Sequence, residues 1–128
     1  MSIIGIGIDL CEVARVENSL QKHGDRFADK ILHPNEKKHF EQQKFQARFL
    51  AKRFAAKEAF AKAMGTGIAH GVTFPNIEIY NDELGKPGLK LHSSTQEKLA
   101  ALGATHVHLS ISDERETAIA QVIIERIT

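Results

Sequence analysis

A stretch of helix-forming residues in the middle of the chain, Phe45–Met64, limits the possible folds more than any other segment. It contains no Gly, no Pro and no β-branched residue, and it is rich in Ala, Lys and Arg, which lose little free energy on entering a helix. Gly65 follows, and a glycine can adopt the left-handed conformation that ends a helix. The sequence therefore predicts one helix of roughly 30 Å, at about 1.5 Å per residue.

The apolar residues of this helix spread around most of its circumference, which is typical of a buried helix. Even so, a single acid, Glu58, stands among several bases of the segment and its approach: Lys44, Arg48, Lys52, Arg53, Lys57 and Lys62. Glu58 and Lys62 are four residues apart and share a helix face. The simplest interpretation of the pair is an ordinary salt bridge; a functional site is the alternative.

The other segments predict an α+β fold, with helices mainly in the first half and a mostly antiparallel sheet around the long central helix. Periodicity and capping residues predict helices over Glu12–His23, Asp25–Leu32, Pro34–Gln42 and Ser93–Leu102. Alternating or β-branched residues predict strands over Ser2–Leu10, Ile77–Asn81, Leu89–His92, residues 106–112 and Ala118–Ile127. We expect Asp25 to cap the second helix, Ser93 or Ser94 to cap the last, and Ala118–Ile127 to be a central strand.

Length and composition exclude several classes of protein. The 128 residues suit one domain spanning 1–128, and a formal net charge of +1 gives no general attraction to nucleic acid. Cys11 is the only cysteine, so an intrachain disulfide is impossible and a reducing compartment is expected. The N-terminal run lacks a positively charged leader, and no apolar run approaches the roughly 20 residues that span a membrane. We therefore expect a cytoplasmic protein.

The N-terminal strand carries the first candidate for chemistry, Asp9, in the run Gly5–Asp9. This run is no dinucleotide fingerprint, because the third glycine is missing; two glycines inside a strand instead indicate the close approach of another backbone. From spacing alone, Asp9 is best interpreted as a cap of the next helix. With Glu58, however, it would form the oxygen-ligand pair that Mg²⁺ takes beside substrate phosphates, and the bases would complete a phosphate site.

A second candidate, His106 and His108, places two imidazoles on one face of a predicted strand. We reject zinc binding there, because no Cys or carboxylate stands at a matching position nearby. A polar strand face, hydrogen-bonded or lining a pocket, is the better interpretation.

Two motifs resemble the signatures of bacterial holo-[acyl-carrier-protein] synthases, within the 4′-phosphopantetheinyl transferases. Gly5–Asp9 with Glu12 and Arg15 resembles the first signature, and Phe49–Ala59 with Lys62 and residues 65–67 resembles the second. The sequences Asp82-Glu83-Leu84-Gly85-Lys86-Pro87 and His108-Leu109-Ser110-Ile111-Ser112 also fit. The resemblance covers nearly the whole chain, from about residue 3 to about residue 126.

The resemblance implies a reaction, transfer of the phosphopantetheine arm of coenzyme A to a serine of apo-acyl carrier protein in fatty acid biosynthesis, with release of adenosine 3′,5′-bisphosphate. It implies that Asp9 and Glu58 hold magnesium and that Lys62 touches phosphate oxygens. Glu58, directly or through a metal-bound water, is the expected general base. The further residues implied in coenzyme binding are Arg53, Lys57, Gly65, Thr66, Gly67 and His108, with Lys44 and Arg48 as weaker candidates.

The resemblance also implies partners. An acidic carrier protein calls for positive charge, which Arg15, Lys22 and Arg26 supply on and just beyond the first predicted helix. Members of the family look like homotrimers with the coenzyme site between subunits. In one respect this chain departs from the pattern: Asp113 stands where some members carry a histidine, so a nucleotide contact made by that histidine is not carried over.

Two other functions share features with this sequence. An Asp at a glycine-rich strand end also occurs in actin-like kinases, but these need two large domains and repeated phosphate loops, for which the chain is too short. A non-catalytic module that binds an acidic protein or a nucleotide through the basic helix is the main alternative. It leaves Asp9 and Glu58 unexplained, and the near-zero net charge and few aromatic residues argue against nucleic acid.

Overall fold

The computed structural model describes all residues, 1–128, and contains five helices and five strands. In chain order the elements are β1 (Ser2–Glu12), α1 (Val13–His23), α2 (Asp25–Ile31), α3 (Pro34–Glu41), α4 (Gln46–Met64), β2 (Ile77–Asn81), β3 (Pro87–Leu91), α5 (Ser93–Ala101), β4 (His106–Asp113) and β5 (Thr117–Arg126). The predicted α+β class is confirmed, and every predicted helix and strand is present within a few residues of its expected bounds.

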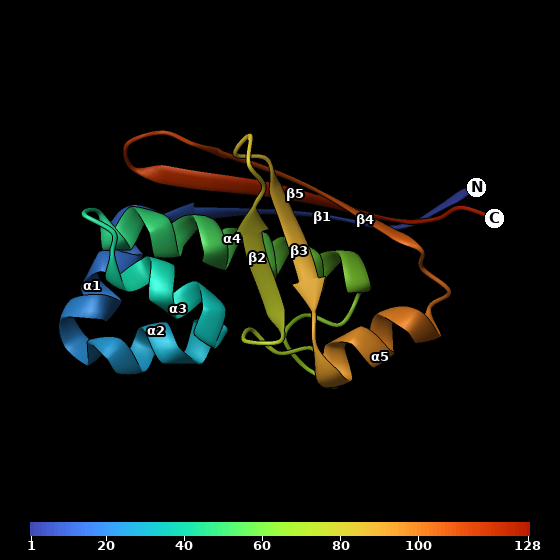
Figure 1. The fold of residues 1–128 in the computed structure, drawn as a ribbon, viewed down its shortest axis with the longest axis horizontal. Coiled ribbons are helices and arrows are strands. Elements are labelled where there is room, and N and C mark those ends of the chain that lie inside the picture. The colour runs from blue at the N-terminus through green and yellow to red at the C-terminus, as the bar shows by residue number, and fades with distance from the viewer.

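The strands form two antiparallel sheets. The larger has the order β1-β5-β4, so that the long β-branched strand β5 is central as predicted, and the smaller is the hairpin of β2 and β3. Helix α4 lies along one face of the larger sheet, and the short helices α1, α2 and α3 lie at one end of it (Figure 1). The β2–β3 hairpin crosses α4 on the same side of the sheet, so the opposite face of the sheet stays uncovered (Figure 1). The two termini lie together at the end opposite α1 (Figure 1).

Helix α4 touches the sheet closely because β1 has glycines where the two meet. A Cβ on Gly5 would lie 1.9 Å from the carbonyl oxygen of Ala63, and one on Gly7 would lie 1.9 Å from that of Ala59. No side chain fits at such distances, so the predicted close approach of a second backbone is confirmed, and that backbone belongs to α4.

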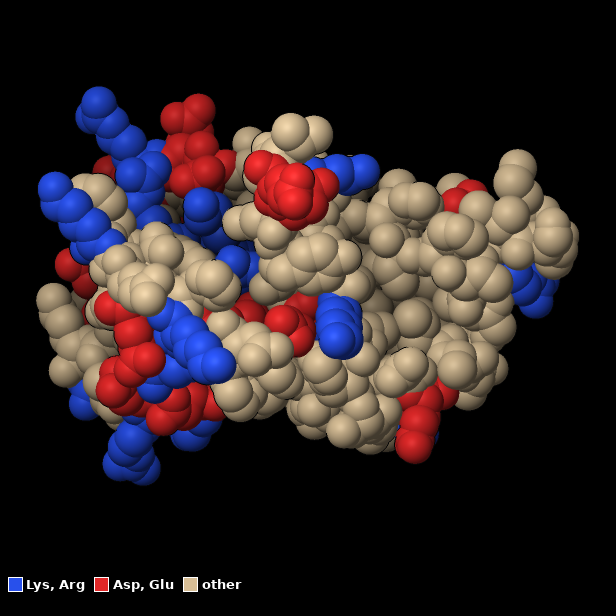
Figure 2. All heavy atoms as spheres, viewed as in Figure 1, with Lys and Arg blue, Asp and Glu red and all other residues tan.

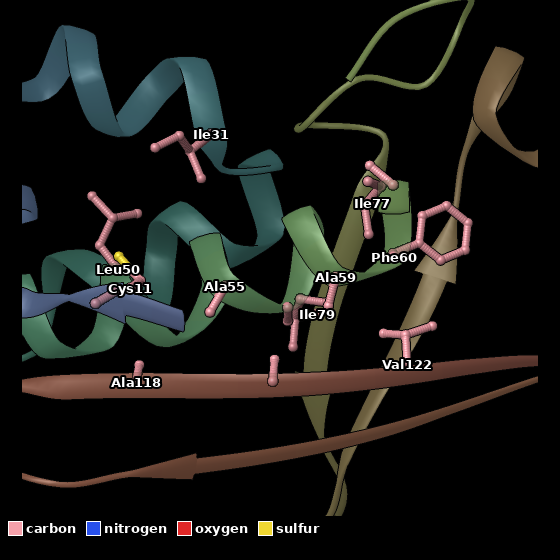
Figure 3. Close-up of a cluster of buried hydrophobic side chains, with 14 of the residues drawn as sticks. Cys11, Ile31, Leu50, Ala55, Ala59, Phe60, Ile77, Ile79, Ala118 and Val122 are labelled. Carbon is pink, nitrogen blue, oxygen red and sulfur yellow. The ribbon is translucent and has the colours of Figure 1, made fainter. Parts of the chain in front are cut away.

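The core surrounds α4 on nearly all sides, in agreement with its all-round apolar pattern. Figure 3 shows Ala55 and Ala59 on the side of α4 that faces Ala118 and Val122 of β5. Phe60 and Ile77, both fully buried, pack on the side of the hairpin. The small residues allow α4 and the sheet to approach, and the larger ones fill the space between α4 and the other elements.

Three capping predictions are wrong. Gly24 and His92 are the residues before α2 and α5, and neither Asp25 nor a serine caps through its side chain. Asp9 lies inside β1, four residues before α1 begins, and so caps no helix. Its side chain is thereby left for the contacts described below. No helix of the structure has the length and hydropathy that crossing a membrane requires.

Candidate active site

Asp9 and Glu58 come together where β1 crosses α4. Both line one hollow of about 310 Å³, which also includes Cys11, Arg15 and Phe54. Asp9 is on the inner face of β1, with the glycines that contact α4, and Glu58 is a half-buried residue of that helix. From the sequence, a pairing of these two carboxylates was one hypothesis. The packing of β1 on α4 places both of them in the same hollow.

The electrostatics of this pair favour a cation. Burial raises the pKa of Glu58, the negative charge of Asp9 raises it further, and Lys62 opposes both. Lys62 donates a hydrogen bond to Asp9 Oδ1 at 2.9 Å and one to the carbonyl of Ile8 at 3.0 Å. Two neighbouring carboxylates with a carbonyl beside them form a set of hard oxygen donors, which is the set that Mg²⁺ takes. The residues therefore fit a magnesium ion.

One of the three predicted carrier-docking residues lines this hollow. Arg15 lines it directly, and Lys22 and Arg26 are exposed on α1 and α2. Figure 2 shows that charged side chains gather over the end of the molecule formed by α1, α2 and α3, whereas the opposite end carries few. An acidic partner attracted to Arg15 would therefore lie beside the carboxylate pair.

Lys57, which the resemblance implies in coenzyme binding, has its ammonium enclosed by acceptors of the protein itself. Its side chain has no exposed surface, and its ammonium donates to Glu36 Oε1 at 2.6 Å and to the carbonyls of Ile31 and Phe74. A lysine has three N–H donors, so none is left for a ligand. Burial lowers the pKa of Lys57 to about 8, opposed mainly by Glu36. This lysine joins α4 to Glu36 of α3, to the last residue of α2 and to the loop before β2.

Arg53 is nearly buried but still faces a hollow. Its Nε lies 3.9 Å from Glu36 Oε2, its Nη1 has no hydrogen-bond partner, and burial lowers its pKa. It lines a hollow of about 170 Å³ together with Lys52, Asn81 and Asp113. The unpaired N–H of a buried guanidinium is a ready donor to an anionic oxygen.

Asp113, at the position where relatives can carry a histidine, pairs with Arg48 at 3.4 Å. An acid at this wall of the Arg53 hollow repels a phosphate that a histidine would attract. The ion pair with Arg48 offsets part of that repulsion. Arg48, a weaker candidate from the sequence, lies beside this hollow because it pairs with Asp113, which lines it.

The remaining sequence candidates lie apart from the carboxylate pair within one chain. Gly65 ends α4 in the left-handed conformation, Gly67 also has a positive φ, and Thr66 bonds the carbonyl of Gly67. His108 projects from the outer face of the sheet, half exposed and hydrogen-bonded to Glu125 at 2.9 Å. Asp9 is on the inner face, so the side chains of the two residues point to opposite sides of the sheet.

Comparison with known proteins decides the family. The family model described as the 4′-phosphopantetheinyl transferase superfamily matches residues 5–121. The chain belongs to this superfamily. It is 54% identical over 125 residues to the holo-[acyl-carrier-protein] synthase of Vibrio parahaemolyticus serotype O3:K6, covering 98% of this chain and 99% of that protein.

Solved structures agree. The crystal structure of holo-[acyl-carrier-protein] synthase from Neisseria meningitidis matches with a TM-score of 0.94 and 45% identity, covering 98% of this chain and 100% of that one. The Bacillus anthracis holo-(acyl-carrier-protein) synthase, solved in complex with CoA (3′,5′-ADP), matches with a TM-score of 0.82 and 42% identity over 98% of each chain. The resemblance inferred from the two motifs is confirmed across the chain.

The sequence did not reveal the role of Glu36, the acid that contacts two bases of α4, Arg53 and Lys57. Glu36 is 1% exposed, accepts from Lys57 and from the backbone N–H of His33 and Ile79, and faces Arg53. The one available signal was local, since Pro34 followed by an acid two positions later marks the first turn of a helix. That signal identifies a capping acid but not its distant lysine and arginine partners.

Proposed function

We propose that the chain transfers 4′-phosphopantetheine from coenzyme A to a serine of apo-acyl carrier protein, releasing adenosine 3′,5′-bisphosphate, as a step of fatty acid biosynthesis. The observation that carries this proposal is the meeting of Asp9 and Glu58 in one hollow, with Lys62 and Arg15 beside them. A set of hard oxygen donors next to mobile cations is suited to a diphosphate and its metal.

We assign the metal to Asp9 and Glu58. A magnesium ion bound there would neutralise the diphosphate of coenzyme A and stabilise the charge of the leaving group. Lys62, whose side chain is 52% exposed, can turn from Asp9 to a phosphate oxygen when the metal takes that carboxylate. Arg53 with its free Nη1 is proposed for another phosphate, and the backbone N–H groups of residues 65–67 for the nucleotide.

We assign the role of general base, which accepts the proton of the serine hydroxyl, to Glu58. The serine oxygen forms a bond to the phosphorus that carries the pantetheine arm, the P–O bond of the diphosphate breaks, and the serine proton passes to Glu58. In the metal-free protein, burial and the neighbouring Asp9 raise the pKa of Glu58. A bound cation would lower that pKa and weaken Glu58 as a base, so the proton could also pass to Glu58 through a water held beside it.

Docking of the carrier protein is assigned to Arg15, with Lys22 and Arg26 as outer contacts. Acyl carrier protein is acidic, and all three bases are exposed. Because Arg15 lines the hollow itself, a carboxylate bound to it would bring the partner's serine to the edge of the carboxylate pair. Longer-range attraction by the outer two bases would raise the rate of encounter.

The proposed assembly is a homotrimer with the coenzyme site between subunits. No element covers the outer face of the larger sheet (Figure 1), and its β1 residues Ile6, Ile8 and Leu10 are 58%, 54% and 60% exposed. An apolar face of this kind supports burial against a second copy. His108 lies on the same face, so its proposed coenzyme contact would be to the site of a neighbouring protomer. A free, buried Cys11 is compatible with the proposed cytoplasmic location.

The alternative is a basic helix that binds an acidic partner without catalysis. It needs an exposed basic surface along α4, and two of the bases of this helix are buried. Arg53 is 6% exposed and Lys57 is fully buried, both engaged with Glu36. The bases of α4 therefore do not form a continuous exposed strip.

The experiment that tests the proposal is the mass of apo-acyl carrier protein after incubation with the chain, coenzyme A and Mg²⁺. We expect a gain of one phosphopantetheine that is abolished by a chelator and restored by added Mg²⁺. A gain that persists with chelator would overturn the metal assignment, and no gain with several carrier proteins would overturn the function.

A further inference from the structure

A cluster of two histidines and a glutamate lies outside the proposed active site. His33 precedes α3, Glu78 belongs to β2, and His92 follows β3. Segments up to 59 positions apart in the sequence thus bring one potential ligand atom each to a common point, where the three atoms lie within 4.8 Å of one another. None of the three residues lines the hollow of Asp9 and Glu58.

The carboxylate of this cluster has no full cationic partner. Glu78 is 8% exposed; His92 Nε2 lies 2.8 Å from its Oε1, and the side-chain amide of Asn35 lies 3.3 and 3.4 Å from its two oxygens. No lysine or arginine is within ion-pair distance of it. A buried carboxylate held only by an amide and one imidazole N–H is well suited to a cation.

We propose that His33, Glu78 and His92 form a binding site for a late first-row transition metal of the zinc class. Zinc bonds to nitrogen and oxygen are about 2.0–2.2 Å long, so the ligand atoms of a tetrahedral site lie roughly 3.3 Å apart. Oε1 of Glu78 is 2.8 Å from His92 Nε2 and 3.7 Å from His33 Nδ1, values on either side of that separation. Three protein ligands leave a fourth position for water.

The hydrogen bonds identify the atoms that must change. His33 Nδ1 accepts from the backbone N–H of Asn35 at 3.0 Å, so this nitrogen is unprotonated and carries the lone pair that a metal needs. His92 Nε2 donates to Glu78, so its proton must move to Nδ1, which has no partner. Metal binding therefore exchanges two hydrogen bonds for three coordinate bonds.

The two imidazoles must also rotate. Their rings are stacked, with centroids 4.3 Å apart and planes inclined by 17°, whereas a metal lies in the plane of each ring that binds it. His33 must release the N–H of Asn35, and His92 must release Glu78, which is its only side-chain contact. His92 is thus the less restrained ring, and we expect it to turn further. Asn35 and Glu78 line a hollow of about 310 Å³, which gives the ion a path to the cluster.

The donor set separates this site from the one proposed for magnesium. Two imidazole nitrogens and one carboxylate favour zinc, nickel or copper, while the carboxylate pair Asp9 and Glu58 favours a hard ion. A metal held by the His33 cluster would tie the start of α3 to β2 and to the start of α5. It would therefore stabilise the fold rather than take part in transfer.

The test is calorimetric titration of the full chain with Zn²⁺ in millimolar Mg²⁺, which saturates the hard site, together with the unfolding temperature at each zinc concentration. We compare the wild type with His92→Gln, which keeps a donor for Glu78, and with His33→Asn, which keeps a side-chain oxygen to cap α3. The control is His23→Gln, at an exposed histidine of α1 that belongs to no such cluster.

We expect one zinc per chain and a rise in unfolding temperature for the wild type and the control. In His92→Gln and His33→Asn the affinity should fall by at least roughly tenfold, since even the loss of an outer-shell partner costs about 10–100-fold. Zinc affinity unchanged in both cluster variants would overturn the proposal, as would the absence of binding by the wild type, or an equal loss in the control.

Discussion

Lys62 Nζ lies 2.9 Å from Asp9 Oδ1, so one lysine of α4 occupies an oxygen of the proposed metal pair. Its side chain is 52% exposed and that of Asp9 is 15% exposed. The lysine can therefore leave the carboxylate without unfolding any element. This relationship explains how one cation can neutralise Asp9 in the free protein and a phosphate in the complex.

We predict that Lys62→Gln lowers kcat/KM for coenzyme A by roughly 10²-fold, the usual scale for losing one donor to developing charge. Unfolding in urea should show a change below about 1 kcal/mol, because exposed ion pairs contribute little. Lys30→Gln, at an exposed lysine of α2, is the control. A kcat/KM within twofold of wild type for Lys62→Gln would contradict the assignment.

Glu58 should give the metal-free protein a distinctive pH dependence. Its folded pKa is raised, by burial first and by Asp9 second, so the folded state binds this proton more tightly than the unfolded chain does. Its contribution to stability is therefore fully present below the unfolded pKa of about 4.3 and is lost as pH rises through the folded pKa. Saturating Mg²⁺ should oppose that loss, because the ion binds the charged form.

The measurement for Glu58 is urea unfolding at a series of pH values, with chelator and with Mg²⁺, for wild type and Glu58→Gln. We expect the substitution to leave the fold intact, to remove this pH-dependent component and to abolish metal-dependent turnover. Identical profiles in the two proteins would show that the carboxyl is unperturbed, and full activity of the variant would exclude its role.

The sequence predicted the elements of this fold well because the local signals agreed with the tertiary structure. The uninterrupted pattern of Phe45–Met64, the ending at Gly65 and the β-branched run that became β5 all gave the correct element. The paired glycines of β1 also predicted the close approach of a second backbone, which the structure identifies as that of α4. Capping was predicted poorly, since Asp25 and Ser93 are good caps in isolation but the chain enters both helices in other conformations.

The grouping of the candidate site residues was predicted in part, and the limit is physical. Motifs pointed to Asp9, Glu58 and Lys62, which the fold brings together, but spacing could not tell which bases of α4 face solvent. Lys57 and Glu58 are neighbours, and the first is buried against Glu36 while the second borders a hollow. That difference depends on α3, which joins α4 only in three dimensions.

Arg15 provides a test of the docking surface. We predict that Arg15→Ala raises KM for acyl carrier protein by about tenfold or more, with little change in KM for coenzyme A, because the removed charge faces the protein partner. The effect should shrink at high ionic strength, as exposed charges are screened. Arg126→Ala, an exposed arginine at the end of β5, is the control. Equal increases in both KM values would refute the assignment.

Lys57 should be needed for stability rather than for substrate binding. We predict that Lys57→Met lowers the free energy of unfolding by about 3–5 kcal/mol, because it leaves the carboxylate of Glu36 buried without its charge partner. The double variant Lys57→Met/Glu36→Gln should recover part of this loss, since it removes the unpaired charge. Urea unfolding of both singles and the double gives the coupling. Additive losses would contradict the pairing.

The same lysine predicts a rise in stability at alkaline pH. Its folded pKa is about 8, lowered by burial from 10.5, so between these values the unfolded chain binds the proton and the folded chain does not. Raising the pH through this window removes that advantage of the unfolded state. The contribution should be visible as a difference between wild type and Lys57→Met, in which it is absent.

The contact between β1 and α4 predicts a severe effect of the smallest possible substitution. In Gly7→Ala the new Cβ would lie 1.9 Å from the Ala59 carbonyl oxygen and 2.8 Å from the backbone nitrogen of Ala63. Both are backbone atoms of a buried helix and cannot move alone, so we expect a loss of more than about 3 kcal/mol of unfolding free energy or no folded protein.

In the control, Gly88→Ala, the Cβ meets the ring of Tyr80, which is 47% exposed and free to turn. Circular dichroism and urea unfolding should show Gly88→Ala within about 1 kcal/mol of wild type. Equal stability of the two variants would mean that α4 and β1 are not in backbone contact, and Asp9 would then no longer be held against Glu58.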